Sequence, residues 1–186
     1  MAGTDNGSAA RSRAPAAAEA LVTLLNSRPH AEPPLPDRLD DHERAAEILG
    51  SYGFAEAGDL TAERLDQVRA LRADLMAAVD AAGADEARQR WDALSAHVSG
   101  IAFRLDFADG TPALSQVTGD PLLGGIVAAV ADVLRDGTWK RIRVCANDGC
   151  RAVFYDATRS RTQRWHSYEL CGNRANVAAF RARENA

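Results

Sequence analysis

The three cysteines of this 186-residue chain all lie within its last 42 residues, with one histidine among them. In order, the four residues are Cys145, Cys150, His166 and Cys171, which is C-x4-C followed, after fifteen residues, by H-x4-C. Two pairs of thiol and imidazole ligands on either side of one loop suit tetrahedral Zn²⁺, and a closed set of four is typical of structural sites. The pattern therefore predicts a small module that folds around one structural Zn²⁺.

The composition limits the rest of the chain. At 46% hydrophobic residues it can form one domain with a real core and a small appended module. The best apolar run, 121–134, is shorter than the roughly twenty residues of a membrane span and contains Asp132. Residues 1–18 lack the apolar region of a secretory signal, so we expect a disordered tail. We expect a cytoplasmic protein without a membrane span, whose thiols bind metal rather than form disulfides.

The net charge of −4 hides a division between two parts of the chain. From Trp139 onward there are ten basic and four acidic residues, whereas the residues before Trp139 include twelve basic and twenty-two acidic ones. Such a division favours a basic part that binds a polyanion and an acidic part that orients the encounter by repulsion. The alternative is that the basic part docks on the acidic domain of its own chain.

Apolar residues at helical spacing predict five helices, over residues 16–26, 40–49, 61–79, 85–98 and 121–134. Thr61 caps the third helix, Asp120 before Pro121 caps the fifth, and Asp40 with Glu43 is spaced as a capping box for the second. Alternating residues on either side of Asp109-Gly110 predict a β-hairpin. Its face of Phe103, Leu105 and Phe107 is expected to belong to the core. Residues 19–137 are therefore predicted to form a mainly helical α+β domain with one hairpin.

Residues 138–186 are predicted to form the zinc module. A strand over 139–144 and its return over 151–155 place Cys145 and Cys150 on the turn between them, where Gly149 supplies the backbone conformation of a metal knuckle. Cys171 then opens a helical segment, 174–184, whose Val177 and Phe180 are expected to pack back against the hairpin. Two ligands from a knuckle and two at a helix describe a small treble-clef-like finger.

The segment Cys171-Gly172-Asn173-Arg174 is the signature of the CGNR zinc-finger family. The surrounding frame is similar to that family too, from the strand before Cys145 through Phe154-Tyr155-Asp156 to Arg164-Trp165-His166-Ser167. The upstream region is similar to the ABATE domain that accompanies this finger, and Leu24-Leu25-Asn26-Ser27 resembles its opening Leu-Val-Asn-Thr element. The resemblance implies a bacterial transcription regulator, described as stress-induced, with a DNA-binding finger.

His166 departs from this resemblance, because the family usually has a cysteine at that position. Imidazole is an ordinary zinc ligand, so the site would hold three thiolates and one imidazole, with one negative charge fewer. A histidine must be neutral to bind metal, so zinc affinity is expected to fall at mildly acidic pH. The alternative for His166 is a partly exposed side chain beside Trp165.

A guanidinium group stays charged and can bind two oxygens of one phosphate at once. The arginines of the module are therefore the candidates for DNA contacts. The six candidates are Arg159, Arg161, Arg164, Arg174, Arg181 and Arg183. For two motif residues a structural role is equally consistent with the sequence: Asn173 as a helix cap or a partner of the zinc loop, and Arg174 as a partner of Asp156.

Three functions fit these features. The first is a zinc-containing regulator that binds double-stranded DNA, whose helical domain forms a homodimer or binds a small-molecule effector between hairpin and helices. The second is an adaptor whose finger binds a protein or RNA without sequence-specific DNA binding. The third, a zinc enzyme, needs an open coordination position and a poised acid or base, which a closed set of four ligands does not provide. We favour the regulator and expect no catalytic residues.

Overall fold

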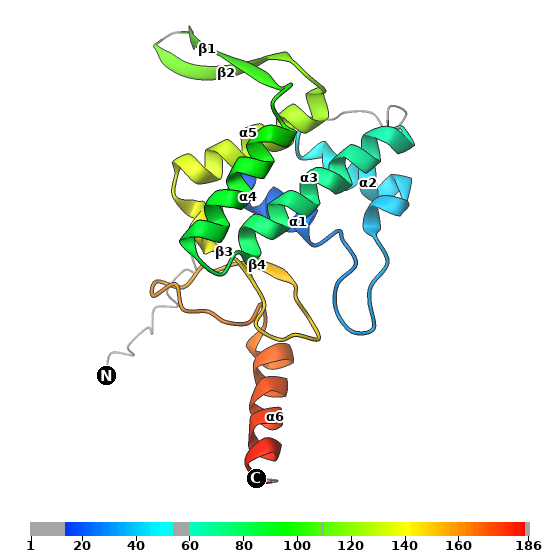
Figure 1. Ribbon diagram of the computed structural model, residues 1–186, viewed down its shortest axis with the longest axis vertical. Helices are drawn as coiled ribbons and strands as arrows, with labels where there is room; N and C mark the ends of the chain where they lie inside the picture. Colours follow the sequence, from blue (N-terminus) through cyan, green and yellow to red (C-terminus); the bar gives the residue numbers. More distant parts are fainter. Residues whose placement is uncertain (1–13, 54–59, 109, 185–186) are drawn as a thin grey trace, which may run out of the picture.

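The computed structural model describes residues 14–53, 60–108 and 110–184, so part of the predicted tail and Asp109 of the hairpin turn lie outside the described residues. The helical domain contains α1 (Ala16–Leu25), α2 (His42–Gly50), α3 (Ala62–Asp80), α4 (Ala84–His97) and α5 (Pro121–Arg135). Strands β1 (Ala102–Ala108) and β2 (Thr111–Thr118) form a hairpin between α4 and α5 (Figure 1). The finger contains β3 (Ile142–Val144), β4 (Val153–Tyr155), the π-helical turn η4 (Tyr168–Gly172) and α6 (Asn173–Glu184). The predicted fold class is confirmed.

Helices α2, α3 and α5 begin at residues whose side chains accept hydrogen bonds from the first turn. Thr61 accepts from the Arg64 N–H at 3.2 Å, and Asp120 accepts from the two residues after Pro121, as predicted. The cap of α2 differs from the prediction, because Asp41 rather than Asp40 accepts the two N–H bonds. Asp40 instead ends a short 3₁₀ turn, η1 (Arg38–Asp40), which sets the start of α2 one residue later.

The core is built around α1, which runs through the middle of the other helices (Figure 1). Leu21, Leu24 and Leu25 are fully buried, and each contributes about 1.5–3 kcal/mol of burial free energy. The same core includes Ile142 of β3 and Val153 of β4. The finger therefore shares the apolar core of the helical domain, while a second, smaller cluster surrounds the three cysteines.

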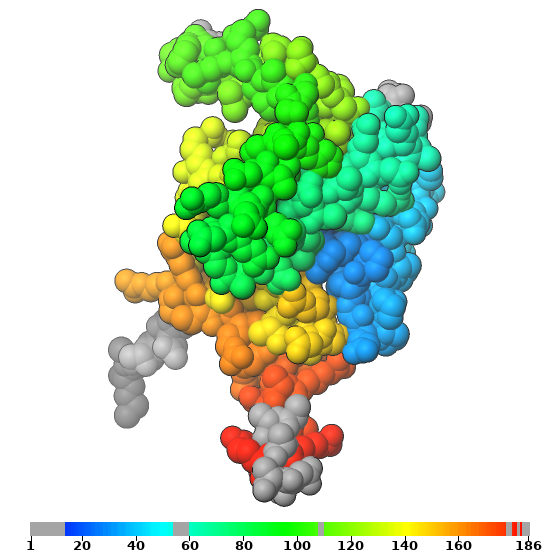
Figure 2. Space-filling view, in the orientation of Figure 1, coloured from blue at the N-terminus to red at the C-terminus, as the bar shows by residue number. Residues whose placement is uncertain are grey.

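The β1–β2 hairpin projects from one end of the molecule, opposite α6 (Figures 1 and 2). It is antiparallel, with Leu105 opposite Leu114. Leu105 is 51% exposed and Phe107 is 70% exposed, so the expectation that this face belongs to the core is wrong. The base of the hairpin is held against α5. There Gln116 donates to the Asp120 carbonyl at 3.0 Å, and a side chain at Gly124 would overlap Gln116.

No helix in the described part of the chain combines the length and the apolar character needed to cross a bilayer.

Candidate metal centre

The first pair of ligands lies on the turn between β3 and β4, as predicted. Ile142 of β3 stands opposite Tyr155 of β4, and beyond the strands the Cys145 N–H donates to the Ala152 carbonyl at 2.7 Å. The Cys150 N–H donates to the Asn147 carbonyl at 2.8 Å and closes the knuckle. The left-handed residue of this turn is Arg151, with φ of 54°, and not Gly149. The role expected of Gly149 is therefore wrong, because the chain reverses after Cys150 rather than before it.

The second pair is brought to the knuckle by the turn η4. Ser167 organises this turn: its carbonyl accepts from the Cys171 N–H at 2.9 Å and its hydroxyl from the Leu170 N–H at 3.2 Å. Cys171 thus lies in the π-helical turn that leads directly into α6, while His166 stands just before it.

The four ligand atoms lie within 4.8 Å of one another. Nδ1 of His166 lies 3.4 Å from Sγ of Cys150 and 3.7 Å from Sγ of Cys171. Around a tetrahedral Zn²⁺ with ordinary bond lengths, a sulfur and a nitrogen ligand stand about 3.5 Å apart. The three cysteines are buried and form no disulfide. The donor set, its closeness and its burial therefore fit a structural Zn²⁺ whose four positions are all filled by side chains.

Burial of the Cys150 thiol also favours a cation at this site. It raises the pKa of the Cys150 thiol to about 11, because a thiolate in this position loses its hydration. A bound Zn²⁺ supplies the positive charge that keeps such thiols deprotonated. Three buried cysteines packed against an imidazole are therefore consistent with a metal site.

The loop between the ligand pairs, residues 157–164, is named here the arginine loop. It folds around Asp156, whose fully buried carboxylate accepts from the Thr158 N–H at 2.9 Å and the Gln163 N–H at 3.0 Å. Arg143 donates to the same carboxylate at 3.3 Å and to the Arg161 carbonyl at 2.9 Å. The pairing expected between Arg174 and Asp156 is therefore wrong, because β3 places Arg143 there.

The ionised state of Asp156 follows from these contacts. Burial alone would raise the pKa of this carboxyl, but hydrogen bonds from Thr158, Gln163 and Arg143 outweigh the burial and lower it. The loop is thus arranged around a buried carboxylate. At its far end, the Ala146 N–H donates to the Arg164 carbonyl at 2.9 Å and joins the loop to the knuckle.

The arginines of the finger fall into two groups. Arg141, Arg143 and Arg151 are half-buried and donate hydrogen bonds to the protein. The six candidates for DNA contacts are exposed, and within the described ranges none of them forms an ion pair; they are Arg159, Arg161, Arg164, Arg174, Arg181 and Arg183. Arg164 lies over the Trp165 ring, with its guanidinium carbon 5.1 Å from the ring centre. We name these six residues the finger arginines.

Helix α6 carries half of the finger arginines and extends away from the body of the molecule (Figure 1). The expectation that Val177 and Phe180 pack back against the hairpin is wrong, since they are 49% and 55% exposed. The turn η4 directs α6 outward, away from β3 and β4. Asn173, at the start of α6, donates its side-chain amide to the Glu169 carbonyl at 3.2 Å, so it bonds to this turn.

The finger is joined to the helical domain by polar contacts that the sequence did not predict. The side-chain amide of Asn26, just after α1, donates to the Val153 carbonyl and accepts from the Val153 N–H. Arg28 donates to the Arg151 carbonyl at 2.6 Å, and Arg151 pairs with Asp80 at 2.5 Å. The one available signal was Leu24-Leu25-Asn26-Ser27, where polar residues end an apolar helix. The finger thus docks through its hairpin and leaves the finger arginines unused.

Fold and site together define a zinc-finger protein, in which a helical domain is followed by a small module with a closed four-residue metal centre. The CGNR zinc finger family matches residues 141–184, and the ABATE family, described as a putative stress-induced transcription regulator, matches residues 9–137. Because the second match covers more than half of the chain, the chain belongs to the ABATE family, and it carries a CGNR zinc finger. Both predicted resemblances are confirmed. No match was found among curated proteins.

Proposed function

We propose that this chain is a zinc-containing, DNA-binding transcription regulator of the cytoplasm. In this proposal Cys145, Cys150, His166 and Cys171 bind one structural Zn²⁺, and the finger arginines contact the phosphates of duplex DNA. Residues 138–186 form the DNA-binding module, and residues 19–137 form the domain that regulates it. Membership of a family described as a transcription regulator supports this assignment.

One observation carries the proposal: some arginines of the finger bond to the protein, whereas others form no ion pair with the described residues. The arginines that hold the fold lie against the helical domain or under the arginine loop, whereas the finger arginines are exposed without an ion-pair partner in the described residues. Exposed guanidinium groups are available for bidentate bonds to phosphate. If all six contact phosphates, the association constant for DNA should fall as salt is added. A plot of its logarithm against the logarithm of salt concentration should have a slope of about −5.

The metal has a positioning role in this proposal. The arginine loop lies between the two ligand pairs, so both of its ends are tied to the metal centre. When bound, Zn²⁺ supplies a crosslink between the knuckle and the turn η4. Asp156 and Arg143 then hold the inside of the loop, and Arg159, Arg161 and Arg164 remain on the outside. Residues of the protein therefore position the phosphate-binding groups before DNA arrives.

The exposed face of the hairpin is the feature that supports a homodimer in this proposal. Leu105 and Phe107 on β1 and Leu114 on β2 are exposed on one face of the projecting hairpin, at the opposite end of the molecule from α6 (Figure 2). Exposed apolar patches of this kind mark interaction sites. Joining two copies through their hairpins would bury these side chains and leave both fingers free for two DNA half-sites.

The apolar residues of α6 favour a second function, that of an adaptor which binds a protein or an RNA. Val177 is 49% exposed and Phe180 is 55% exposed on α6, and Leu170 in the preceding turn η4 is 58% exposed. An exposed helix with apolar side chains can enter the groove of a partner protein. Binding of DNA would then be weak and independent of the finger arginines.

Selection of bound genomic fragments tests the proposal. The zinc-loaded wild type is compared with an Arg159→Ala/Arg161→Ala/Arg164→Ala variant and with a control of equal charge change, Arg44→Ala/Arg88→Ala/Arg90→Ala in the helical domain. We expect enrichment by the wild type and the control and loss of enrichment in the finger variant. No enrichment by the wild type, or equal loss in both variants, would contradict the proposal.

A further inference from the structure

Helix α6 carries exposed side chains that can contact DNA bases as well as phosphates. Asn173, Arg174, Val177 and Arg181 line one shallow hollow of about 330 Å³ on this helix. Arg174 and Arg181 are exposed, and neither forms an ion pair with another described residue. Val177 stands between them at helical spacing and is 49% exposed. One face of α6 therefore presents two guanidinium groups on either side of an aliphatic side chain.

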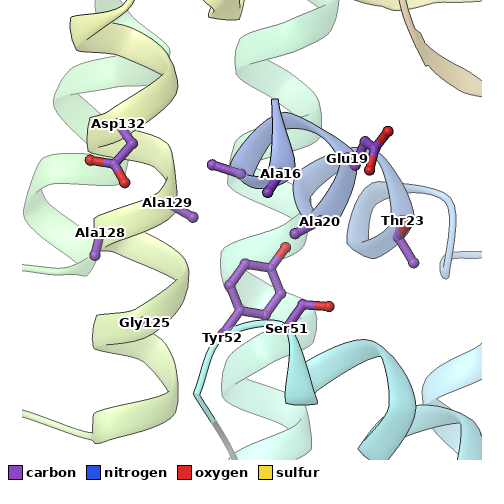
Figure 3. A pocket seen from close by; sticks show the side chains of 11 residues that line it. Ala16, Glu19, Ala20, Thr23, Ser51, Tyr52, Gly125, Ala128, Ala129 and Asp132 are labelled. Carbon is purple, nitrogen blue, oxygen red and sulfur yellow. The ribbon is translucent and has the colours of Figure 1, made fainter. Parts of the chain in front are cut away.

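The charge of α6 favours an anionic partner. Its sequence from residue 173 to residue 183 contains three arginines and no acidic residue. The groove between α1 and α5 differs: Glu19 and Asp132 line it, and in the described part of the chain its lining residues include no Lys, Arg or His (Figure 3). Charge complementarity with a polyanion such as DNA therefore favours α6 over the hollow of the helical domain.

The turn η4 fixes the direction in which α6 extends from the body (Figure 1). The Tyr168 ring packs on Gly172, where a side chain would begin 2.7 Å from Cδ2 of the ring. The Tyr168 hydroxyl accepts from the side-chain amide of Asn176 at 3.2 Å. Cys171 of the same turn belongs to the metal centre, to which the arginine loop is also tied. One metal centre therefore holds both the arginine loop and the start of α6.

The dimensions of α6 suit the major groove of B-DNA. The helix contains 12 residues and is about 18 Å long, and the groove, about 12 Å wide, admits an α-helix. Arg174 and Arg181 are two turns apart, which is about 10.5 Å along the helix axis, so their side chains reach base pairs about two or three steps apart. A guanidinium group binds O6 and N7 of guanine, and an apolar side chain packs against the methyl group of thymine.

We propose that α6 enters the major groove of duplex DNA and reads its sequence. Arg174 and Arg181 contact guanines, and Val177 contacts the methyl group of a thymine between them. This inference rests on the proposed function and narrows it, because two of the finger arginines contact base edges while the other four contact phosphates. Phosphate contacts position a protein on DNA, whereas base contacts give it a sequence preference.

Modified bases test which groove is read. A duplex selected by the zinc-loaded full chain is synthesised with 7-deazaguanine, which lacks the N7 acceptor of the major groove, or with inosine, which lacks only the minor-groove amino group of guanine. We expect 7-deazaguanine at a contacted position to weaken binding by about fivefold or more, and inosine to change it little. No loss with 7-deazaguanine at any guanine, or an equal loss with inosine, overturns the proposal.

Two variants of equal charge change separate the readers from the phosphate contacts. Arg174→Ala/Arg181→Ala should lose the preference for the selected duplex over a scrambled one, together with its sensitivity to 7-deazaguanine. Arg159→Ala/Arg161→Ala should bind both duplexes more weakly by a similar factor and keep the preference. Zinc content and melting temperature show that both variants fold. A preference retained in Arg174→Ala/Arg181→Ala overturns the assignment of the readers.

Val177 is tested through the thymine methyl group. Deoxyuridine in place of thymine removes only this methyl group, and we expect the wild type to bind about fourfold more weakly when it stands at the contacted position. Val177→Ala should bind the two duplexes equally, because the variant lacks the side chain that packs against the methyl group. A dependence on the methyl group that persists in Val177→Ala overturns this contact.

Failure of this inference is distinguishable from failure of the proposed function. If the wild type binds no duplex DNA, the proposed function fails and the reading role of α6 fails with it. If the wild type binds duplex DNA through the arginine loop but shows no sequence preference, only this inference fails. The exposed face of α6 is then left to a protein partner.

Discussion

The side-chain amide of Asn26 is paired with the backbone of Val153, accepting from its N–H at 2.7 Å and donating to its carbonyl at 2.8 Å. This pair connects the end of α1 with β4 across 127 residues of sequence. It completes the edge of a two-stranded hairpin whose Val153 is buried in the core of the helical domain. The Asn26 side chain thus provides hydrogen-bond partners for the N–H and the carbonyl of Val153 at the junction between α1 and the finger.

Replacing Asn26 tests the importance of this junction. Asn26→Ala leaves the Val153 N–H and carbonyl without partners at a partly buried site, so we expect unfolding free energy to fall by about 1–3 kcal/mol. Urea denaturation measures the change. Asn176→Ala removes an exposed amide on α6 and should stay within about 0.5 kcal/mol of the wild type. Equal effects of both variants would argue against a structural junction at Asn26.

The ligand role of His166 can be separated from its size and polarity. His166→Cys supplies a thiolate at the position where the CGNR family usually has one, so we expect one equivalent of zinc to be retained. His166→Ala removes a ligand and should weaken zinc binding by more than the roughly 10–100-fold that follows loss of an outer partner. Competition with a coloured chelator measures both affinities. Unchanged zinc affinity in His166→Ala would show that the imidazole lies beside the metal without binding it.

Asp156 provides a test of how the arginine loop is ordered. Asp156→Asn places an amide where the carboxylate accepts from Thr158 and Gln163, so the loop should loosen while every finger arginine remains. We expect faster hydrogen exchange at the Thr158 and Gln163 amides and weaker binding of duplex DNA. Asp148→Asn, an exposed acid on the knuckle, removes the same charge and should change neither. Protected amides in Asp156→Asn would contradict this role.

Sequence reasoning succeeded where the signal was local. Apolar spacing predicted the five helices, and ligand spacing predicted the residues of the metal centre. The ion-pair partner of a side chain was not predicted where it depends on how distant elements pack together. Asp156 receives Arg143 rather than Arg174, because β3 and β4 are adjacent strands while α6 turns outward. The hairpin face is exposed for a related reason: alternation predicts a strand with one apolar face but does not say whether another element covers it.

Asp37 gives a pH dependence whose sign follows from its contacts. Burial alone would raise the pKa of Asp37, but hydrogen bonds from buried Arg72 and from the Leu39 N–H outweigh it and lower the pKa. A carboxyl with a lowered pKa in the folded state stabilises the fold above its ordinary pKa and loses this contribution as pH falls through the lowered value. The contribution should therefore be complete at neutral pH and decline below about pH 4.

The variant Asp37→Asn isolates this contribution. At pH 7 it leaves the Arg72 guanidinium buried without its counter-charge, so we expect unfolding free energy to fall by about 3 kcal/mol. Below about pH 4 the wild type approaches the variant, and the difference should shrink. Urea denaturation of both proteins across this range measures it, with Asp92→Asn on the exposed face of α4 as control. A difference that stays constant with pH would exclude the ion pair as its source.

The last prediction concerns the exposed hairpin face as the interface of a homodimer. Leu105→Ser with Phe107→Ser changes side chains that are 51% and 70% exposed, so the melting temperature of the folded chain should change little. If two copies join through their hairpins, the same variant should sediment as a monomer at concentrations where the wild type is a dimer. Ile126→Ser, an apolar-to-polar change at a fully buried position of α5, should instead cost about 3 kcal/mol or more of stability. Analytical ultracentrifugation measures assembly and thermal denaturation measures stability; a dimer that survives the hairpin variant would exclude this face as the dimer interface.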